Sequence, residues 1–276
     1  MFIWLASYPK SGNTLVRSML AAYFFSEDGI YDFDQIKNIQ QFPNIELFKS
    51  FGIDQTNEKE VIKNYISIQE KINNKNSVQF FKTHSSLFNI NNNAFTDLNN
   101  SLAVIYIVRD PRNVVTSWSN HNSLSLDDAC NYLIYQNETV GNPNKTYHGT
   151  WDVNFRSWKS FKFQKRYLLI KYEDLIYDKK FFLSKILKFI FKFKKSKSLI
   201  DNEKLNNVLV STTFQKMRDL EIKKGFFEAI SEKRSGKKKP FFHLGPRNDW
   251  RQLLDEKNRV KIESAFGEEM RELGYL

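Results

Sequence analysis

The feature that most constrains the fold is an apolar run, a turn and a helix-like segment in direct succession. Residues 2–6 are continuously apolar, residues 8–14 read Tyr-Pro-Lys-Ser-Gly-Asn-Thr, and residues 15–20 have helical spacing. This order predicts a strand covered on both faces, a tight turn and a helix. Such a turn directs backbone N–H groups and the Lys10 ammonium at one point, as phosphate sites do. It lacks the first glycine and the Gly-Lys-Ser/Thr ending of ATPase and GTPase loops, so a phosphate-like ligand other than ATP is predicted.

The size and composition of the chain predict one large globular domain over residues 1–276. The chain is 41% hydrophobic and 15% aromatic, which excludes a disordered protein. Its formal net charge of +11 favours polyanionic partners, namely nucleotides, nucleic acid, acidic glycans or an anionic membrane. Charge alone does not choose among these partners.

Cysteine content and the N-terminus point to a reducing compartment. The lone Cys130 excludes an internal disulfide. No stretch reaches the length of a membrane span, and an apolar strand beginning at Phe2 leaves no room for a signal peptide. We therefore expect a cytoplasmic protein.

Four short apolar runs predict the central strands of a parallel sheet, at residues 2–7, 78–81, 102–108 and 167–170. Helical patterns lie between and after them, at residues 15–25, 113–121, 183–193 and 255–273. Strands that alternate with helices predict a doubly wound α/β fold, in which a mostly parallel sheet is flanked by helices and ligands bind at the carboxyl ends of the strands. Residues 26–76 show no obvious strand, and the asparagine-rich residues 89–100 predict a solvated loop.

A second motif follows the third predicted strand. Residues 109–117 read Arg-Asp-Pro-Arg-Asn-Val-Val-Thr-Ser, with the proline suited to the first turn of a helix. Arg109 leaves the strand at its ligand-binding end, and Ser117 lies about two turns into the helix. On the residues alone, an alternative remains open in which Arg109 and Asp110 are a solvated pair that closes the turn.

Six segments in order resemble the sulfotransferases that use 3′-phosphoadenosine 5′-phosphosulfate (PAPS). Residues 8–14 resemble the family's 5′-phosphosulfate loop, and residues 109–117 resemble its 3′-phosphate motif. The other four matching segments are residues 82–84, 172–175, 212–217 and 245–250. Each motif alone is weak, but six in register span almost the whole chain. The resemblance implies a P-loop-like phosphosulfate-binding loop and PAPS as co-substrate, with no metal.

The resemblance also implies roles for residues near the transferred group. Lys10 would contact the 5′-phosphate and the bridging oxygen, with donors from the loop residues Ser11, Gly12, Asn13 and Thr14. His84 would be the general base, because imidazole accepts a proton near neutral pH. Lys82 would contact the sulfuryl oxygens, although a strand-end lysine is as often solvated. His121, His148 and His243 are not assigned as the base, and His121 is expected to pack or to line the pocket.

Residues that hold the nucleotide follow from the same resemblance. Arg109 and Ser117 would bind the 3′-phosphate through a charge-assisted fork and a hydroxyl. The segments after them supply candidates for the adenine, with core packing as the competing interpretation: Tyr172, Thr212 and Phe214. Gly245 and Arg247 belong to the closing segment of the donor site.

Two positions depart from the pattern of the cytosolic members of the family. Leu15 stands where they have a tryptophan that stacks on adenine, and His243-Leu244-Gly245 stands where their closing loop reads Arg-Lys-Gly. The missing cations weaken 3′-phosphate binding unless other bases replace them. Our hypothesis is that Arg247 or the lysines at 237–239 do so.

The acceptor is expected to be a small molecule, glycan or peptide with a hydroxyl, or less favourably an amine. Its specificity should lie in residues 26–76, 122–150 and 225–242.

No nucleic-acid motif or zinc pattern is present. The lysine-rich residues 185–197 predict a core-facing helix with a solvated lysine face, with contact with a membrane surface or an acidic glycan as the minor alternative. A kinase-like phosphotransferase and a degenerate nucleotide-binding module remain alternatives, and the sequence does not reveal the oligomeric state.

Overall fold

The computed structural model describes residues 1–73, 77–135, 146–193, 198–230 and 238–276. The chain forms two compact units, which we describe separately. The sheet unit comprises Met1–Tyr8, Asn38–Val108 and Gln136–Ile200, and the helical unit comprises Pro9–Lys37, Arg109–Tyr135 and Asp201–Leu276. The chain passes from the sheet unit into the helical unit directly after β1 and again directly after β6. The prediction of one domain over residues 1–276 stays a prediction.

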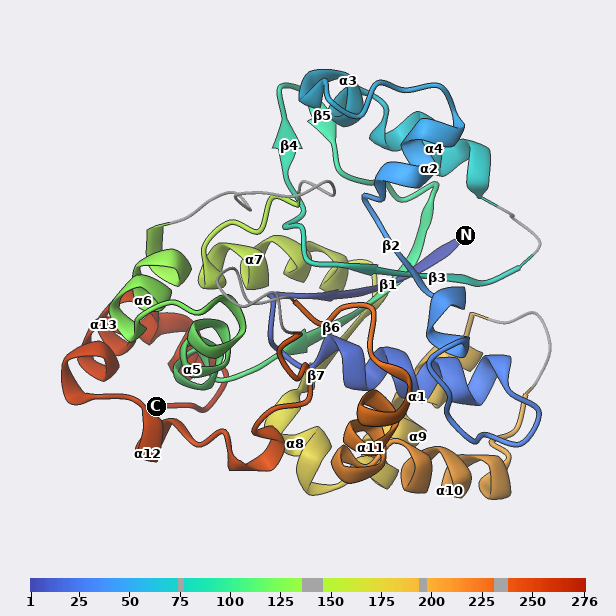
Figure 1. Ribbon diagram of the computed structural model, residues 1–276. Coiled ribbons are helices and arrows are strands. Elements are labelled where there is room, and N and C mark those ends of the chain that lie inside the picture. Colours follow the sequence, from blue (N-terminus) through green and yellow to red (C-terminus); the bar gives the residue numbers. More distant parts are fainter. Residues whose placement is uncertain (74–76, 136–145, 194–197, 231–237) are drawn as a thin grey trace. The chain divides into compact units, whose positions relative to one another are not determined.

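The sheet unit contains a five-stranded sheet in the order β2-β3-β1-β6-β7 (Figure 1). All four pairings are parallel, which confirms the predicted parallel α/β sheet. The strands are β1 (Phe2–Ser7), β2 (Gln40–Gln41), β3 (Gln79–Thr83), β6 (Ser101–Val108) and β7 (Tyr167–Lys171). Every residue of β1 is buried because β1 lies at the centre of the sheet, which explains its continuous apolar sequence.

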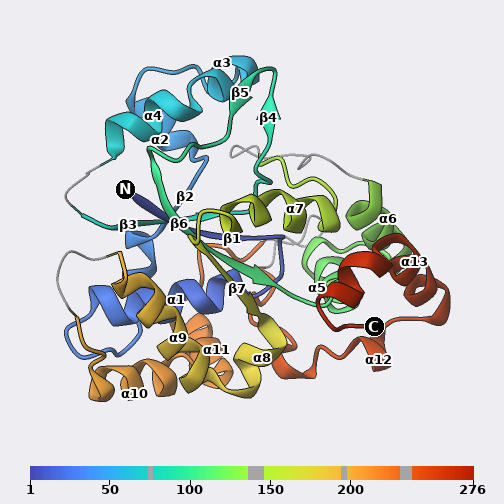
Figure 2. The same cartoon turned by 180° about the vertical axis from the view of Figure 1, so that it is seen from behind.

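Helices cover both faces of this sheet, as predicted. Figures 1 and 2 show α7 above the strands and α8 and α9 below them. α7 packs on β1 and β6, and both α8 and α9 pack on β7. The helices of this unit are α2 (Ile45–Ser50), α3 (Glu58–Lys63), α4 (Tyr65–Ile72), α7 (Trp151–Trp158), η2 (Lys159–Lys162), α8 (Tyr172–Tyr177) and α9 (Lys179–Phe191).

An aromatic cluster forms the core on one face of the sheet. The Trp4 ring on β1 has its centroid 5.8 Å from that of Phe42, 5.4 Å from that of Phe95 and 6.2 Å from that of Trp158. Such rings bury large apolar areas and favour tilted or edge-to-face contacts. The cluster fixes the chain after β2 and the end of α7 against the central strand.

Two sequence predictions in this unit are wrong. Residues 26–76 do contain a strand, β2, and the asparagine-rich residues 89–100 contain a hairpin of β4 (Asn89–Ile90) and β5 (Asn93–Ala94) rather than only a loop. Each of these strands is two residues long, which is too short to show the alternation of apolar and polar residues by which a strand is predicted. The second predicted strand also extends further, because Lys82 and Thr83 are its last residues.

The lysine-rich segment packs as predicted over its described part. Leu183, Ile186 and Ile190 on α9 are fully buried, while Lys185 and Lys188 are exposed. Residues 194–197 of that segment lie outside the described residues. None of the helices that the structure describes combines the length and apolar character needed to cross a bilayer.

The helical unit carries the helices that follow β1 and β6 along the chain. α5 packs on α6 and α13, α1 packs on α10, and α10 packs on α11. The elements are α1 (Asn13–Phe25), α5 (Pro111–Asn122), α6 (Leu126–Tyr135), α10 (Asn202–Ser211), α11 (Phe214–Lys224), η3 (Gly245–Arg247), α12 (Trp250–Leu253) and α13 (Glu256–Glu272), with η1 (Gln35–Asn38) at the boundary. The last helix begins after its cap Asp255 and ends before Gly274, as the sequence predicted.

Candidate functional site

The candidate base lies where two neighbouring parallel strands end. Ser7 is the last residue of β1, and His84 directly follows the last residue of β3. His84 Nδ1 lies 2.9 Å from the Ser7 carbonyl oxygen and 3.2 Å from Ser7 Oγ. A carbonyl oxygen only accepts, so Nδ1 carries the hydrogen and donates it. In the neutral ring Nε2 then holds the lone pair, which is the state that a general base needs.

The backbone of His84 is held by a buried amide that the sequence analysis did not identify. Asn154 on α7 is fully buried, and its Nδ2 donates to the carbonyl oxygens of His84, at 2.9 Å, and His148, at 2.8 Å. Its Oδ1 accepts a 2.7 Å hydrogen bond from the Tyr106 hydroxyl on β6. One amide contact therefore holds the backbone of His84, and the contacts with His148 and Tyr106 fix the amide itself.

We expect Asn154→Ala to lower kcat by about 10²-fold, because a small displacement of a reacting group costs about that much. Donor affinity, measured by calorimetry with the nucleotide product, should stay within a few-fold of wild type. Tyr106→Phe leaves both carbonyl contacts of Asn154 in place and should cost less than Asn154→Ala. Equal losses of kcat and of donor affinity in Asn154→Ala would instead indicate general unfolding.

A second histidine beside the candidate base stays uncharged. The His148 ring centroid lies 6.2 Å from that of His84 and 6.0 Å from that of Tyr8. Burial lowers the pKa of His148 to about 3, so its ring is neutral at physiological pH. His148 Nε2 lies 2.9 Å from Thr146 Oγ1. His148 therefore packs the site, consistent with the prediction that it is not the base.

Lys82 and Tyr172 also lie in the sheet unit. Lys82 is only 5% exposed, which excludes the solvated alternative for this lysine. Its carbonyl oxygen accepts a 2.9 Å hydrogen bond from the Phe42 N–H. Tyr172 is the first residue of α8, directly after β7, and is half-buried. Their roles at the sulfuryl group and the adenine stay predictions.

The lysine turn has the backbone conformation of an anion-binding loop. Lys10 has φ 65° and Gly12 has φ 96°, and α1 begins directly afterwards at Asn13. When residues in the left-handed region alternate with residues outside it, the successive backbone N–H groups of the turn point to the same side of the loop. Ser11 is fully buried, and its Oγ has no hydrogen-bond partner among the described residues. An unsatisfied buried hydroxyl in such a loop fits a ligand that accepts hydrogen bonds, as phosphate and sulfate do.

The second motif meets this loop within the helical unit. Arg109 is 7% exposed, and its Nη1 donates to the Lys10 carbonyl oxygen at 3.1 Å. Ser117 is half-buried on α5, two turns beyond Arg109. The solvated-pair alternative for Arg109 and Asp110 is wrong, because both residues are buried.

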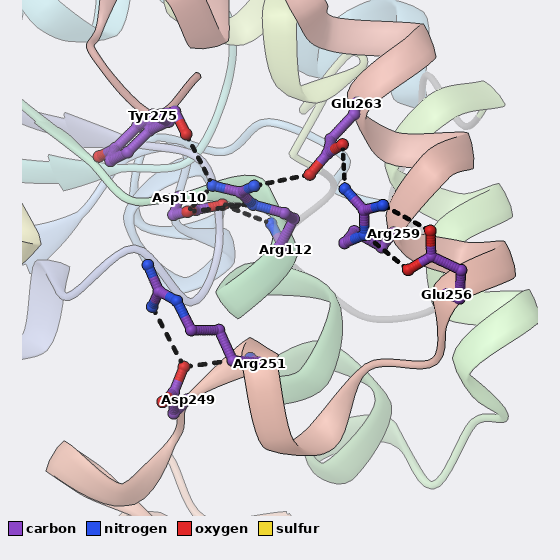
Figure 3. A network of polar contacts seen from close by, with 8 residues as sticks. All are labelled: Asp110, Arg112, Asp249, Arg251, Glu256, Arg259, Glu263 and Tyr275. Carbon is purple, nitrogen blue, oxygen red and sulfur yellow. Dashed lines mark hydrogen bonds and ion pairs between the residues drawn. The ribbon is translucent and has the colours of Figure 1, made fainter.

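A buried ion-pair network fixes the start of α5 beside Arg109 (Figure 3). Asp110 caps the helix by accepting from the Arg112 N–H at 2.9 Å, and also accepts from Arg112 Nη2 at 2.7 Å. The Arg112 guanidinium further donates to Glu263 Oε1 at 2.7 Å and to the Tyr275 carbonyl oxygen at 2.9 Å. Its carbon Cζ lies 3.9 Å from the centre of the Trp250 ring. The network ties the helix that follows Arg109 to α13 and to the C-terminal residues.

The two adenine-site candidates of the helical unit lie where α10 ends and α11 begins. The Phe214 ring packs against Gly245, where a Cβ would come within 2.4 Å of two ring carbons. Gly245 also has φ 53°, so both space and backbone conformation favour glycine there. Thr212 is fully buried, and its hydroxyl donates to the Val208 carbonyl oxygen at 2.6 Å, which favours the packing interpretation for this residue.

The closing segment contains a cluster of positive charges. Partial burial lowers the pKa of His243, and three neighbouring cations lower it further: Arg218, Lys239 and Arg247. Lys239 Nζ donates to Asn120 O at 3.1 Å and Ser123 Oγ at 2.6 Å, while Arg247 is exposed on η3. Lys237 lies outside the described residues. His121 packs edge-to-face with Phe241 at 6.0 Å, consistent with a packing role.

Sequence reasoning also missed an ion pair beside the lysine turn. Arg17 Nη1 donates to Glu228 Oε1 at 2.7 Å, and Thr14 Oγ1 donates to Glu228 Oε2 at 3.4 Å. An arginine within the apolar stripe of α1 was the available signal. Among the residues that the structure describes, no group of three or more His, Cys, Asp or Glu side chains is placed to hold a metal ion.

Comparison with known proteins defines the class of this protein. The family model described as "Sulfotransferase domain" matches residues 2–274, so the chain belongs to this family. It is 28% identical over 171 residues to sulfotransferase 2A1 of Macaca fascicularis, covering 62% of this chain and 57% of that protein. It is 23% identical over 284 residues to sulfotransferase 1 family member D1 of Mus musculus, covering 97% of this chain and 83% of that protein.

Solved structures share the fold. Mouse sulfotransferase SULT7A1 complexed with PAP (3′-phosphoadenosine 5′-phosphate) has a TM-score of 0.59 at 20% identity, covering 98% of this chain and 84% of that one. Retinol dehydratase in complex with androsterone and inactive cofactor PAP has a TM-score of 0.63 at 16% identity, covering 98% of this chain and 80% of that one. At these identities the likeness concerns the fold alone.

Proposed function

We propose that this sulfotransferase transfers a sulfuryl group from PAPS to a hydroxyl of a small-molecule, glycan or peptide acceptor, or less favourably to an amine. The contact between Arg109 Nη1 and the Lys10 carbonyl oxygen carries the proposal. It joins the predicted 3′-phosphate anchor to the predicted phosphosulfate loop within one compact unit. PAP in two structural neighbours supports the same donor.

The residues present fit a donor with several negative charges. The buried Ser11 hydroxyl and the N–H groups of the turn would hold the 5′ end, together with Gly12, Asn13 and Thr14. Arg109 and Ser117 would hold the 3′-phosphate, which separates this donor from ordinary adenine nucleotides. Phe214 and Tyr172 are the adenine candidates that keep a half-buried ring. The proposal assigns no step to a metal.

Two side chains would carry the chemistry. The bound donor supplies an activated sulfuryl group, whose sulfur–oxygen bond to the 5′-phosphate breaks as the acceptor oxygen bonds to sulfur. His84 Nε2 takes the proton that the acceptor hydroxyl loses, because its Nδ1 hydrogen is already donated to the Ser7 carbonyl. The Lys10 ammonium neutralises the charge that develops on the departing phosphate oxygen.

Calorimetric titration with PAP and with AMP tests the donor assignment. We expect wild type to prefer PAP, and Arg109→Ala to weaken PAP binding by about 10²–10³-fold because a buried charged contact is lost. AMP lacks the 3′-phosphate, so its affinity should change far less. Arg271→Ala, an exposed arginine on α13, is the matched control and should bind PAP normally. Equal affinity of wild type for PAP and AMP would contradict the proposed donor.

The same titration tests which base replaces the missing cations of the closing segment. Arg247 is exposed beside Arg218 and Lys239, whose charges all act on His243. Lys239 is already bound to Asn120 and Ser123. We therefore assign the compensating role to Arg247 first, so Arg247→Ala should weaken PAP binding more than AMP binding. The compensation hypothesis fails if neither Arg247→Ala nor removal of the lysines at 237–239 changes PAP affinity.

A further inference from the structure

The outward face of α9 in the sheet unit has no role in the mechanism proposed above. The inner face of this helix is apolar and packs on β7. Exposed side chains follow one stripe along the helix and its C-cap, defined here as Phe181, Lys185, Lys188 and Lys192. Their spacing of four, three and four residues places them on one side of a helix. The stripe therefore faces solvent, on the side of α9 that the sheet does not cover.

The stripe carries positive charge without neighbouring carboxylates on the same helix. From Lys179 to Phe193 the chain contains five lysines and no Asp or Glu. Among the residues that the structure describes, no ion pair involves Lys185, Lys188 or Lys192. The nearest carboxylate along the chain, Asp178, caps the start of α9. The stripe therefore presents its positive charge to whatever approaches this face.

The stability of the helix does not account for this arrangement of lysines. Lys179 and Lys180 are the first residues of α9, where the positive end of the helix dipole favours carboxylates instead. Lys185 lies three residues before Lys188, which lies four residues before Lys192, and like charges at these spacings repel. A negatively charged surface would relieve both effects. Charges that oppose local stability are expected where they bind a partner.

An exposed aromatic ring within the stripe favours a membrane over other anionic partners. Phe181 is 58% exposed, and Tyr177, at the end of α8, is 95% exposed. In helices that lie on a membrane, aromatic rings enter the boundary between headgroups and acyl chains while lysines bind anionic lipids. Nucleic acids and other phosphate ligands are characteristically held by arginine forks, but residues 172–193 contain no arginine. Lysine point charges suit the diffuse potential of a lipid surface.

We propose that the outward face of α9 binds an anionic membrane surface. The three lysines of the stripe would contact the lipid headgroups, and the Phe181 ring would enter the boundary beneath them. Long lysine stems allow this, because they lie along apolar surface while the ammonium stays among the headgroups. Since the apolar face of α9 is buried in the protein, the contact is peripheral and reversible. This inference goes beyond the proposed function and does not rest on it.

Sedimentation with vesicles of phosphatidylcholine, with and without phosphatidylserine, tests this inference. We expect wild type to bind the vesicles that contain phosphatidylserine, and to bind them more weakly as salt is added. The triple variant Lys185→Gln, Lys188→Gln and Lys192→Gln should bind these vesicles about 10²-fold more weakly, because each lysine near such a surface contributes about fivefold.

A second triple variant is the matched control for net charge. It carries Lys49→Gln, Lys59→Gln and Lys63→Gln, three exposed lysines on α2 and α3, and should bind vesicles within a few-fold of wild type. Circular dichroism spectra of both triple variants should match that of wild type, because every substituted side chain is exposed.

A single substitution tests the aromatic ring. Phe181→Ala should weaken binding to phosphatidylserine vesicles by about tenfold, because the ring no longer leaves water. Leu98→Ala, which removes a 46% exposed apolar side chain outside the stripe, should have no effect. Unchanged binding of Phe181→Ala would overturn the membrane assignment, since a polyanion in solution does not need the ring.

Three further results would overturn the inference. The first is that wild type does not bind vesicles containing phosphatidylserine. The second is an equal loss of binding in the two triple variants, which would show that net charge and not this face governs the contact. The third is binding of a heparin oligosaccharide through the lysines of the stripe without vesicle binding, which would identify an acidic glycan as the partner.

Discussion

His84→Ala is expected to lower kcat for sulfuryl transfer by about 10²–10⁴-fold, the contribution of a positioned general base. The reason is the tautomer set by Ser7: the Nδ1 hydrogen is donated at 2.9 Å, which leaves Nε2 to take the acceptor proton. Transfer from labelled PAPS, measured at saturating donor and acceptor, gives kcat directly.

Two controls separate proton transfer from binding and folding. The affinity of His84→Ala for PAP should match that of wild type, since the residues assigned to the nucleotide's phosphates lie in other segments. Added imidazole should restore part of the rate, because it can accept the proton in place of the missing ring. Full activity of His84→Ala would show that another group is the base.

Arg112→Ala is expected to destabilise the protein by about 3–5 kcal/mol, the usual cost of leaving a buried charge without its partner. The Arg112 and Asp110 side chains are each 6% exposed, and Arg112 also contacts Glu263 and the Tyr275 carbonyl (Figure 3). Urea unfolding followed by circular dichroism measures the change.

Arg251 provides a matched control on the same tryptophan. Its carbon Cζ lies 4.8 Å from the Trp250 ring centre, but its side chain is 69% exposed and pairs with Asp249 at 3.4 Å. Arg251→Ala should therefore cost less than about 1 kcal/mol, as exposed pairs do. Similar losses in the two variants would indicate that the Trp250 contact, and not the buried network, stabilises this region.

The sequence predicted the parts of the fold where a local pattern is long enough to repeat. The runs at residues 2–7 and 102–108 are continuously apolar because the strands they form are covered on both faces. β2 and the β4–β5 hairpin escaped prediction because each strand has only two residues. Their pairing depends on the neighbouring strand or turn, and not on a periodicity of their own.

The residues of the candidate site also fall into two groups, those that the sequence predicted and those that only the structure revealed. Lys10, His84 and Arg109 could be predicted from the sequence because each lies in a short motif that resembles one of the family's and follows a predicted strand. Asn154 and Glu228 belong to no motif, since their contacts are with residues far away along the chain.

The amino-acid sequence by itself determined the parallel α/β architecture, because that architecture follows from local apolar patterns. The family was indicated by motifs at the strand ends that resemble those of its members. The tertiary structure alone decided which nitrogen of His84 holds the lone pair, which amide holds its backbone and which carboxylates pair with Arg112. Those properties depend on hydrogen bonds and burial between segments that are distant in sequence, which no local pattern records.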